Sequence, residues 1–117
     1  MKTIFCDIDG TLLKHTGDIS KQHKINGDVI LLPGTLQKLK EWDKKGYRII
    51  LTTGRRESTR KRTEEQLLEA GIFYDLLIMG LSNGNRVLIN DRKVDSVLDT
   101  AFGINIDRNV GIENVEI

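Results

Sequence analysis

Four short apolar runs mark the chain, and their hydrophobic residues stand next to one another instead of alternating with polar ones. Strands that are covered on both faces of a parallel sheet have this pattern. The runs predict strands at 4–8, 49–51, 76–79 and 87–89, with a fifth, weaker strand at 101–106.

Two segments between the first three runs have the features of helices. Thr35–Lys45 lies between Pro33-Gly34 and Gly46, and its apolar residues are spaced for one helical face. The segment 58–70 begins at a serine and is followed by a glycine. The alternation of strand and helix predicts an α/β fold with a doubly wound, mainly parallel sheet built from right-handed βαβ units. Ligands of such sheets bind at the carboxyl ends of the strands.

Composition narrows the class of protein. The 117 residues are 30% charged, carry a net charge of +1 and include one cysteine. We expect a single domain over 1–117, in which 13–32 forms a loop or a small hairpin flap. A lone cysteine allows no disulfide within the chain, and no apolar run is long enough to span a membrane. Since no signal peptide is evident either, we expect no membrane partner and a cytoplasmic location.

Acidic residues follow the first predicted strand in the sequence Asp7-Ile8-Asp9-Gly10-Thr11-Leu12. Asp7 and Asp9 are two residues apart, so an extended backbone places both on one side. Neighbouring carboxylates repel, and a hard divalent cation such as Mg²⁺ relieves that repulsion. An Asp-Gly surface turn is the alternative interpretation.

The second and fourth predicted strands also end in polar residues. Thr53, Gly54 and Arg55 follow the second, where a hydroxyl, a backbone amide and the start of the next helix suit a phosphate. Asn90 and Asp91 follow the fourth and would complete an oxygen-rich metal site if that strand lies beside the first. Taken alone, each group is also compatible with an ordinary turn.

In combination, these residues resemble a known family. The sequence from Asp7 to Leu12, Thr53 and the Asn90-Asp91 pair resemble motifs I, II and IV of the haloacid dehalogenase superfamily of phosphotransferases, in the expected order and over residues 1 to about 106. The resemblance implies that Asp7 is the nucleophile and Asp9 the general acid and base. It also implies that Mg²⁺ is held by Asp7, the Asp9 backbone carbonyl and Asp91, and that Thr53 binds the phosphoryl oxygens.

Two positions depart from the superfamily pattern. Asn90 stands where a second acid is usual, so it would ligate metal through its side-chain oxygen or through a water molecule. No lysine occupies the usual place shortly before motif IV. Arg86, the nearest basic residue upstream, and Lys93, just downstream, are the candidates for this substrate-binding role, and we prefer Arg86.

The segment 13–32 is too short for a cap domain, so the chain resembles capless members of the superfamily, whose open sites take large substrates or are closed by a neighbouring subunit. We therefore expect a Mg²⁺-dependent phosphomonoester hydrolase acting on a small phosphorylated metabolite such as a sugar phosphate, with a dimer or tetramer closing the site. The basic run 55–62 resembles the phosphatase domains of polynucleotide kinases, which makes a polynucleotide 3′-phosphatase the second hypothesis. A phosphate-binding module without turnover is the third.

Overall fold

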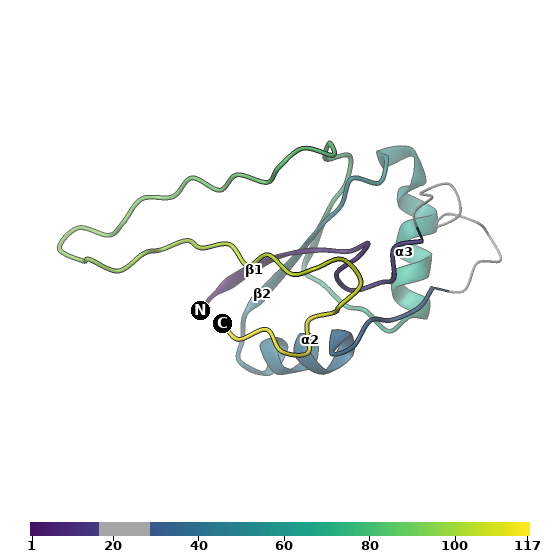
Figure 1. The fold of residues 1–117 in the computed structure, drawn as a ribbon, viewed down its shortest axis with the longest axis horizontal. Helices are drawn as coiled ribbons and strands as arrows, with labels where there is room; N and C mark the ends of the chain where they lie inside the picture. Colours follow the sequence, from purple (N-terminus) through teal and green to yellow (C-terminus); the bar gives the residue numbers. More distant parts are fainter. Residues whose placement is uncertain (17–28) are drawn as a thin grey trace.

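The structure is a computed structural model that describes residues 1–16 and 29–117. Strands and helices alternate along the first two thirds of the chain, as the apolar runs predict (Figure 1). The elements are β1 (Thr3–Asp7), α2 (Thr35–Lys44), β2 (Arg48–Thr52), the 3₁₀ turn η1 (Glu57–Thr59), α3 (Arg60–Glu69) and β3 (Leu76–Ile78).

The three strands form one parallel sheet in the order β1-β2-β3. Phe5 lies opposite Ile50, and Ile50 lies opposite Leu76, so these three residues form a row across the sheet. The predicted α/β class with a parallel sheet is confirmed. All three strands end at the same edge, which places the residues after Asp7 near those after Thr52.

Both helices pack on the same face of this sheet. The buried strand residues Cys6, Leu51 and Leu77 belong to one hydrophobic core with Leu39 and Trp42 of α2, and this core also includes Leu67 of α3. Two right-handed crossovers that advance in the same direction place their helices on one face. The opposite face, which a doubly wound sheet would cover with further helices, therefore has no helix among the described residues, and its row remains partly open, with Phe5 54% and Leu76 48% exposed.

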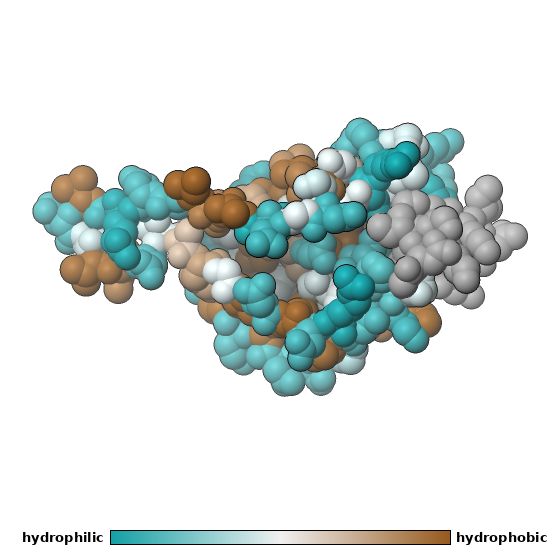
Figure 2. All heavy atoms as spheres, turned by 45° about the horizontal axis from the view of Figure 1, so that its top comes forward, coloured by the Kyte–Doolittle hydropathy of each residue, from teal (hydrophilic) through white to brown (hydrophobic). Residues whose placement is uncertain are grey.

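Residues 84–103 leave the body as an extended excursion, which we call the arm (Figure 1). The sequence predicts strands at 87–89 and 101–106, and this prediction is wrong for the structure, because neither segment is paired with a strand. The molecule is consequently long, measuring 53 × 28 × 25 Å. The apolar side chains of the arm face solvent and appear as brown patches in Figure 2. They are Val87, Leu88, Ile89, Val94, Val97, Leu98 and Phe102, each at least 58% exposed.

After the arm, the chain returns to the body and packs beside α2. Ile112 is buried in the core, and its amide donates a hydrogen bond to the carbonyl of Pro33 (3.0 Å). Gly111 has a φ of 92°, and a Cβ at this position would lie 2.5 Å from the Pro33 carbonyl oxygen. Only glycine fits there, so the contact fixes the path of the C-terminal segment.

The ends of the predicted flap lie side by side, because Leu13 forms an antiparallel bridge with Leu31. Residues 17–28 of this segment lie outside the described part, so its prediction as a loop or hairpin is not tested. No helix in the described ranges is long and apolar enough to cross a membrane.

Candidate active site

The loop that follows β1 is a tight turn anchored in the core. The amides of Leu12 and Leu13 donate hydrogen bonds to the Ile8 carbonyl oxygen (2.8 and 3.0 Å), and all three side chains are fully buried. Gly10, whose φ is 91°, allows the chain to reverse, and its amide donates to the Leu13 carbonyl (2.7 Å). Burial of Ile8, which lies between the two acidic residues, and of Leu12 and Leu13 thus holds Asp7 and Asp9 at the carboxyl end of the sheet.

Asp7 lies at the end of β1, where the residue is exposed as a whole although protein atoms displace part of the water around its carboxyl group. The Thr11 hydroxyl donates a hydrogen bond to its Oδ2 atom (3.1 Å). Loss of water around the carboxyl group raises the pKa of Asp7 above its ordinary value, and the negative charge of Asp9 raises it further, while the bonds from Thr11 and the Ile8 amide and the charge of Arg86 act in the opposite direction. The carboxyl group therefore carries unbalanced negative charge in a partly desolvated position.

Asp9 is held by an arginine from the loop after β2. The Nε and Nη2 atoms of Arg55 donate to the two carboxylate oxygens of Asp9 (2.9 and 2.8 Å), which is the fork geometry of a strong ion pair. The Arg55 side chain is 1% exposed and that of Asp9 10%. The Nη1 atom of Arg55 donates to Gln66 Oε1 (2.6 Å) and Thr63 Oγ1 (3.2 Å), two buried residues of α3. This network fixes both the arginine and the carboxylate.

The sequence assigned Arg55 to the substrate, and the structure places its guanidinium behind Asp9 instead. Buried in this way, Arg55 acts on the site through Asp9 and has no exposed face for a ligand. Sequence analysis missed Thr63 and Gln66 as its partners. They lie on the buried face of α3, and the signal for them was two polar residues at positions where a core-facing helix usually has apolar ones.

Thr53 and Gly54 lie where β2 ends, as the sequence predicts. The Thr53 side chain is buried, and its Oγ1 atom accepts a hydrogen bond from the Arg55 amide (3.1 Å). The loop after β3 is bound to the same place, because the Leu81 amide donates to the Thr53 carbonyl (3.1 Å) and the Gly80 amide to the Arg55 carbonyl (2.7 Å). The loops after β2 and β3 thus form one hydrogen-bonded unit beside Asp9.

The C-terminal segment completes the wall of the site, a role that no sequence pattern assigns to it. The Asn109 amide donates to the Gly10 carbonyl (2.8 Å). The Asn109 side chain accepts from the His15 amide (2.7 Å) and donates to the His15 carbonyl (3.0 Å). This two-way amide contact joins residues 94 positions apart and stabilises the loop that carries Asp7 and Asp9.

The remaining predicted site residues are divided between the body and the arm. Arg86, at the base of the arm, lies near enough to Asp7 to lower its pKa, and it donates to the carbonyls of Ser82 and Gly84 (2.7 and 2.8 Å). Three others lie further along the arm and are exposed; they are Asn90, Asp91 and Lys93. Asn90 donates to Thr100 across the arm (2.8 Å). The structure therefore does not bring Asn90 or Asp91 to Asp7 within a single chain, because the strand expected to carry them there is not formed.

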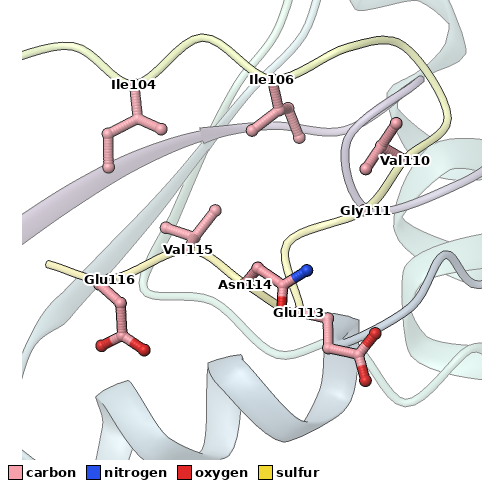
Figure 3. A pocket seen from close by; sticks show the side chains of 8 residues that line it. All are labelled: Ile104, Ile106, Val110, Gly111, Glu113, Asn114, Val115 and Glu116. Atoms are coloured by element: carbon pink, nitrogen blue, oxygen red, sulfur yellow. The ribbon is translucent and has the colours of Figure 1, made fainter.

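A pocket of about 300 Å³ lies in the C-terminal segment, between residues 104–106 and residues 113–116 (Figure 3). Ile104, Ile106 and Val115 point into it, and β1 runs behind it in this view. None of the predicted site residues lines the pocket. It is a hollow formed by the C-terminal segment and not a part of the carboxylate site.

Comparisons with known proteins define the family. Residues 4–102 match the model of the haloacid dehalogenase-like hydrolases. This match covers most of the chain, so the protein belongs to the haloacid dehalogenase-like hydrolase family, as the motifs at Asp7, Thr53 and Asp91 indicate. A comparison with curated proteins gave no match.

Solved structures with a similar fold include chains of an RNA repair complex and a bacterial protein. A chain in a structure of the Pnkp1/Rnl/Hen1 complex is 34% identical over 74% of this chain, with a TM-score of 0.59, and a second structure of that RNA repair complex gives 34%, 73% and 0.59. The protein spans only 30% and 27% of those chains. A protein from Vibrio cholerae is 21% identical, with a TM-score of 0.53, over 80% of this chain and 83% of its own.

Proposed function

We propose that this protein is a phosphomonoester hydrolase in which Asp7 attacks phosphorus and Asp9 moves the proton. The observation that carries the proposal is the arrangement at the end of β1: a partly desolvated, unpaired carboxylate at Asp7 beside a second carboxylate that Arg55 holds in a fork. A nucleophile must be free and a proton-transfer group must be fixed, and the two residues meet these two needs.

In the proposed reaction, an Asp7 oxygen forms a bond to phosphorus while the bond from phosphorus to the ester oxygen breaks. Asp9, protonated on one oxygen that Arg55 has released in the substrate complex, delivers this proton to that leaving oxygen. Asp9 then takes a proton from water, the water oxygen bonds to phosphorus, and the bond between Asp7 and phosphorus breaks to release phosphate. Arg55 is a positioning residue in this scheme, because it acts on the reaction only through Asp9.

The donor set near Asp7 suits Mg²⁺ in part. Its ligands would be oxygen atoms of Asp7 and Asp9. Desolvation and, to a smaller extent, repulsion from Asp9 raise the pKa of Asp7, and a bound cation would offset both effects. Among residues 1–16 and 29–117, however, no three acidic, histidine or cysteine side chains come together as a metal site. Bound Mg²⁺ would neutralise charge on the phosphoryl group, and Asp91 and Asn90 would be its further ligands.

Hydrolysis of an aryl phosphate in the presence of Mg²⁺ tests the proposal. We expect Asp7→Asn to abolish turnover and Asp9→Asn to lower kcat by about 10²- to 10⁴-fold. Asp43→Asn, an exposed acid of α2, is the matched control and should retain full activity. Full activity of Asp7→Asn would show that another group attacks phosphorus.

The preferred substrate class is a small phosphorylated metabolite. The basic run after β2 is neutralised in part by its own neighbours, because Arg55 pairs with Asp9, Arg60 with Glu57 and Glu64, and Arg62 with Glu65. Of its five basic side chains, only Arg56 and Lys61 remain without an ion pair among the described residues, and this is a small charge for a nucleic acid backbone, whose binding depends on neutralised phosphates.

A nucleic acid 3′-phosphate is the second candidate, and the 34% identity to a chain of an RNA repair complex favours it. The two substrate classes differ in their response to salt. We expect kcat/KM for an oligonucleotide 3′-phosphate to match that for a nucleoside 3′-monophosphate and to change little between 50 and 200 mM salt. A steep fall for the oligonucleotide alone would reverse the order of the two candidates.

A further inference from the structure

We propose that a second copy of this chain completes the site, by laying its arm along the outer edge of β1 so that Val87–Ile89 becomes a parallel strand and Asp91 reaches the first copy's Asp7. The proposal rests on the proposed function for the role of Asp91. It identifies the partner of that site as an exchanged arm.

The arm carries apolar side chains that the single chain does not cover. Ile89 is 90% exposed, Val94 90% and Val97 92%. Exposed apolar groups in such number mark a surface that another molecule covers. Contacts across the arm are few and polar, such as Arg92 with Asp99 (2.7 Å), and they leave the hydrophobic side chains open to solvent.

The body has an unpaired strand edge at β1, to which a strand of another chain could bind. Within the described part of the chain, β1 pairs with β2 only, so its outer edge has free backbone groups. An unpaired edge strand is a template for a strand from another chain. The row of Phe5, Ile50 and Leu76 beside this edge is also open, and it would receive apolar side chains of an incoming arm.

In this structure the chain's own arm does not fill this edge, because no arm residue is paired with β1 in the described ranges. Leu81 is tied to Thr53 at the carboxyl end of the sheet, and Arg86 folds back on the carbonyls of Ser82 and Gly84, so the chain enters the arm at that end. A parallel strand beside β1 has to begin at the amino end, about 17 Å away for five residues. The arm of a second copy is free of this constraint.

A parallel orientation of the incoming strand would also bring oxygen ligands to Asp7. The carboxyl ends of parallel strands meet at one edge of a sheet, so the residues after Ile89 would lie beside Asp7. Asn90 and Asp91 would then supply the oxygen atoms that the single chain lacks near its paired carboxylates. Because each copy has one arm and one open edge, the exchange closes as a two-fold dimer.

Molar mass in solution tests the assembly without reference to activity. We expect the wild-type protein to be a dimer by light scattering coupled to size exclusion. Ile89→Glu should give a monomer, because it places a charge in the new strand. Leu68→Glu, at a 79% exposed position of α3, should remain a dimer. A monomeric wild-type protein, or a dimeric Ile89→Glu variant, would overturn the proposal.

Complementation tests the exchange of the arm. Asp7→Asn and Asp91→Asn, each inactive alone, are co-expressed with different tags. An exchanged arm gives each mixed dimer one intact site, so we expect about a quarter of wild-type activity from a random mixture. Asp7→Asn with Asp9→Asn is the control and should stay inactive, because both residues lie on the body. A dimer without complementation would contradict the delivery of Asp91, whereas a dimeric wild-type protein without phosphatase activity would contradict only the proposed function.

Discussion

Replacing Arg55 with alanine measures what holds Asp9 in place. The substitution removes a guanidinium that is 1% exposed, its two bonds to Asp9 and one bond each to Thr63 and Gln66. It also takes the Arg55 charge away from the Asp9 carboxylate, which is only 10% exposed. Removing one partner of a buried ion pair costs about 3–5 kcal/mol, a large part of the 5–15 kcal/mol that stabilises a typical domain.

Urea unfolding followed by circular dichroism gives the magnitude. A loss of about 4 kcal/mol lowers the midpoint by about 2 M when the slope is near 2 kcal/mol per M. Arg55→Lys should lose less, because lysine keeps the charge but not the fork. The control is Arg92→Ala, which breaks an exposed Arg92–Asp99 pair on the arm and should cost less than about 1 kcal/mol. Equal losses for Arg55→Ala and Arg92→Ala would refute the assignment of Arg55 as a buried anchor of Asp9.

Three further measurements follow from features of the site and the core. Because folding raises the pKa of Asp7, ionisation of this residue opposes folding. Asp7→Asn should therefore become more stable than the wild type as the pH rises from about 4 to 7, and melting temperatures measured at both pH values check this. Gly111→Ala should cost more than about 1 kcal/mol in urea, since its Cβ would collide with Pro33, whereas Gly103→Ala has open space and should be neutral. Burial raises the pKa of Cys6 to about 12, so iodoacetamide at pH 8 should label it only after unfolding, as mass spectrometry would show.

Local patterns predicted the elements whose partners lie nearby in sequence. The runs at Thr3–Asp7 and Arg48–Thr52 are strands, Thr35–Lys44 is a helix, and Trp42 and Cys6 are buried as their positions suggest. Each of these elements packs against its neighbours in a βαβ unit, so sequence periodicity carries most of the information needed.

The arm could not be predicted from local patterns. Val87–Ile89 has the composition of a buried strand, but a strand also needs an unpaired sheet edge beside it, and composition does not tell whether the chain brings the segment to such an edge. Arg55 gives a second example. Its segment holds several basic residues, and only the fold decides that this one finds Asp9, 46 positions away, instead of the substrate.

The contact between Asn109 and His15 has a consequence for the order of folding. The loop that carries both carboxylates is fastened by a residue 94 positions downstream, so a nascent chain can pair β1 with β2 before it can close that loop. Contacts of such separation form late, because loop closure costs entropy before the contact gains energy. The emerging polypeptide therefore has its sheet before the loop with Asp7 and Asp9 is closed, and that loop is fastened only after Asn109 has left the ribosome.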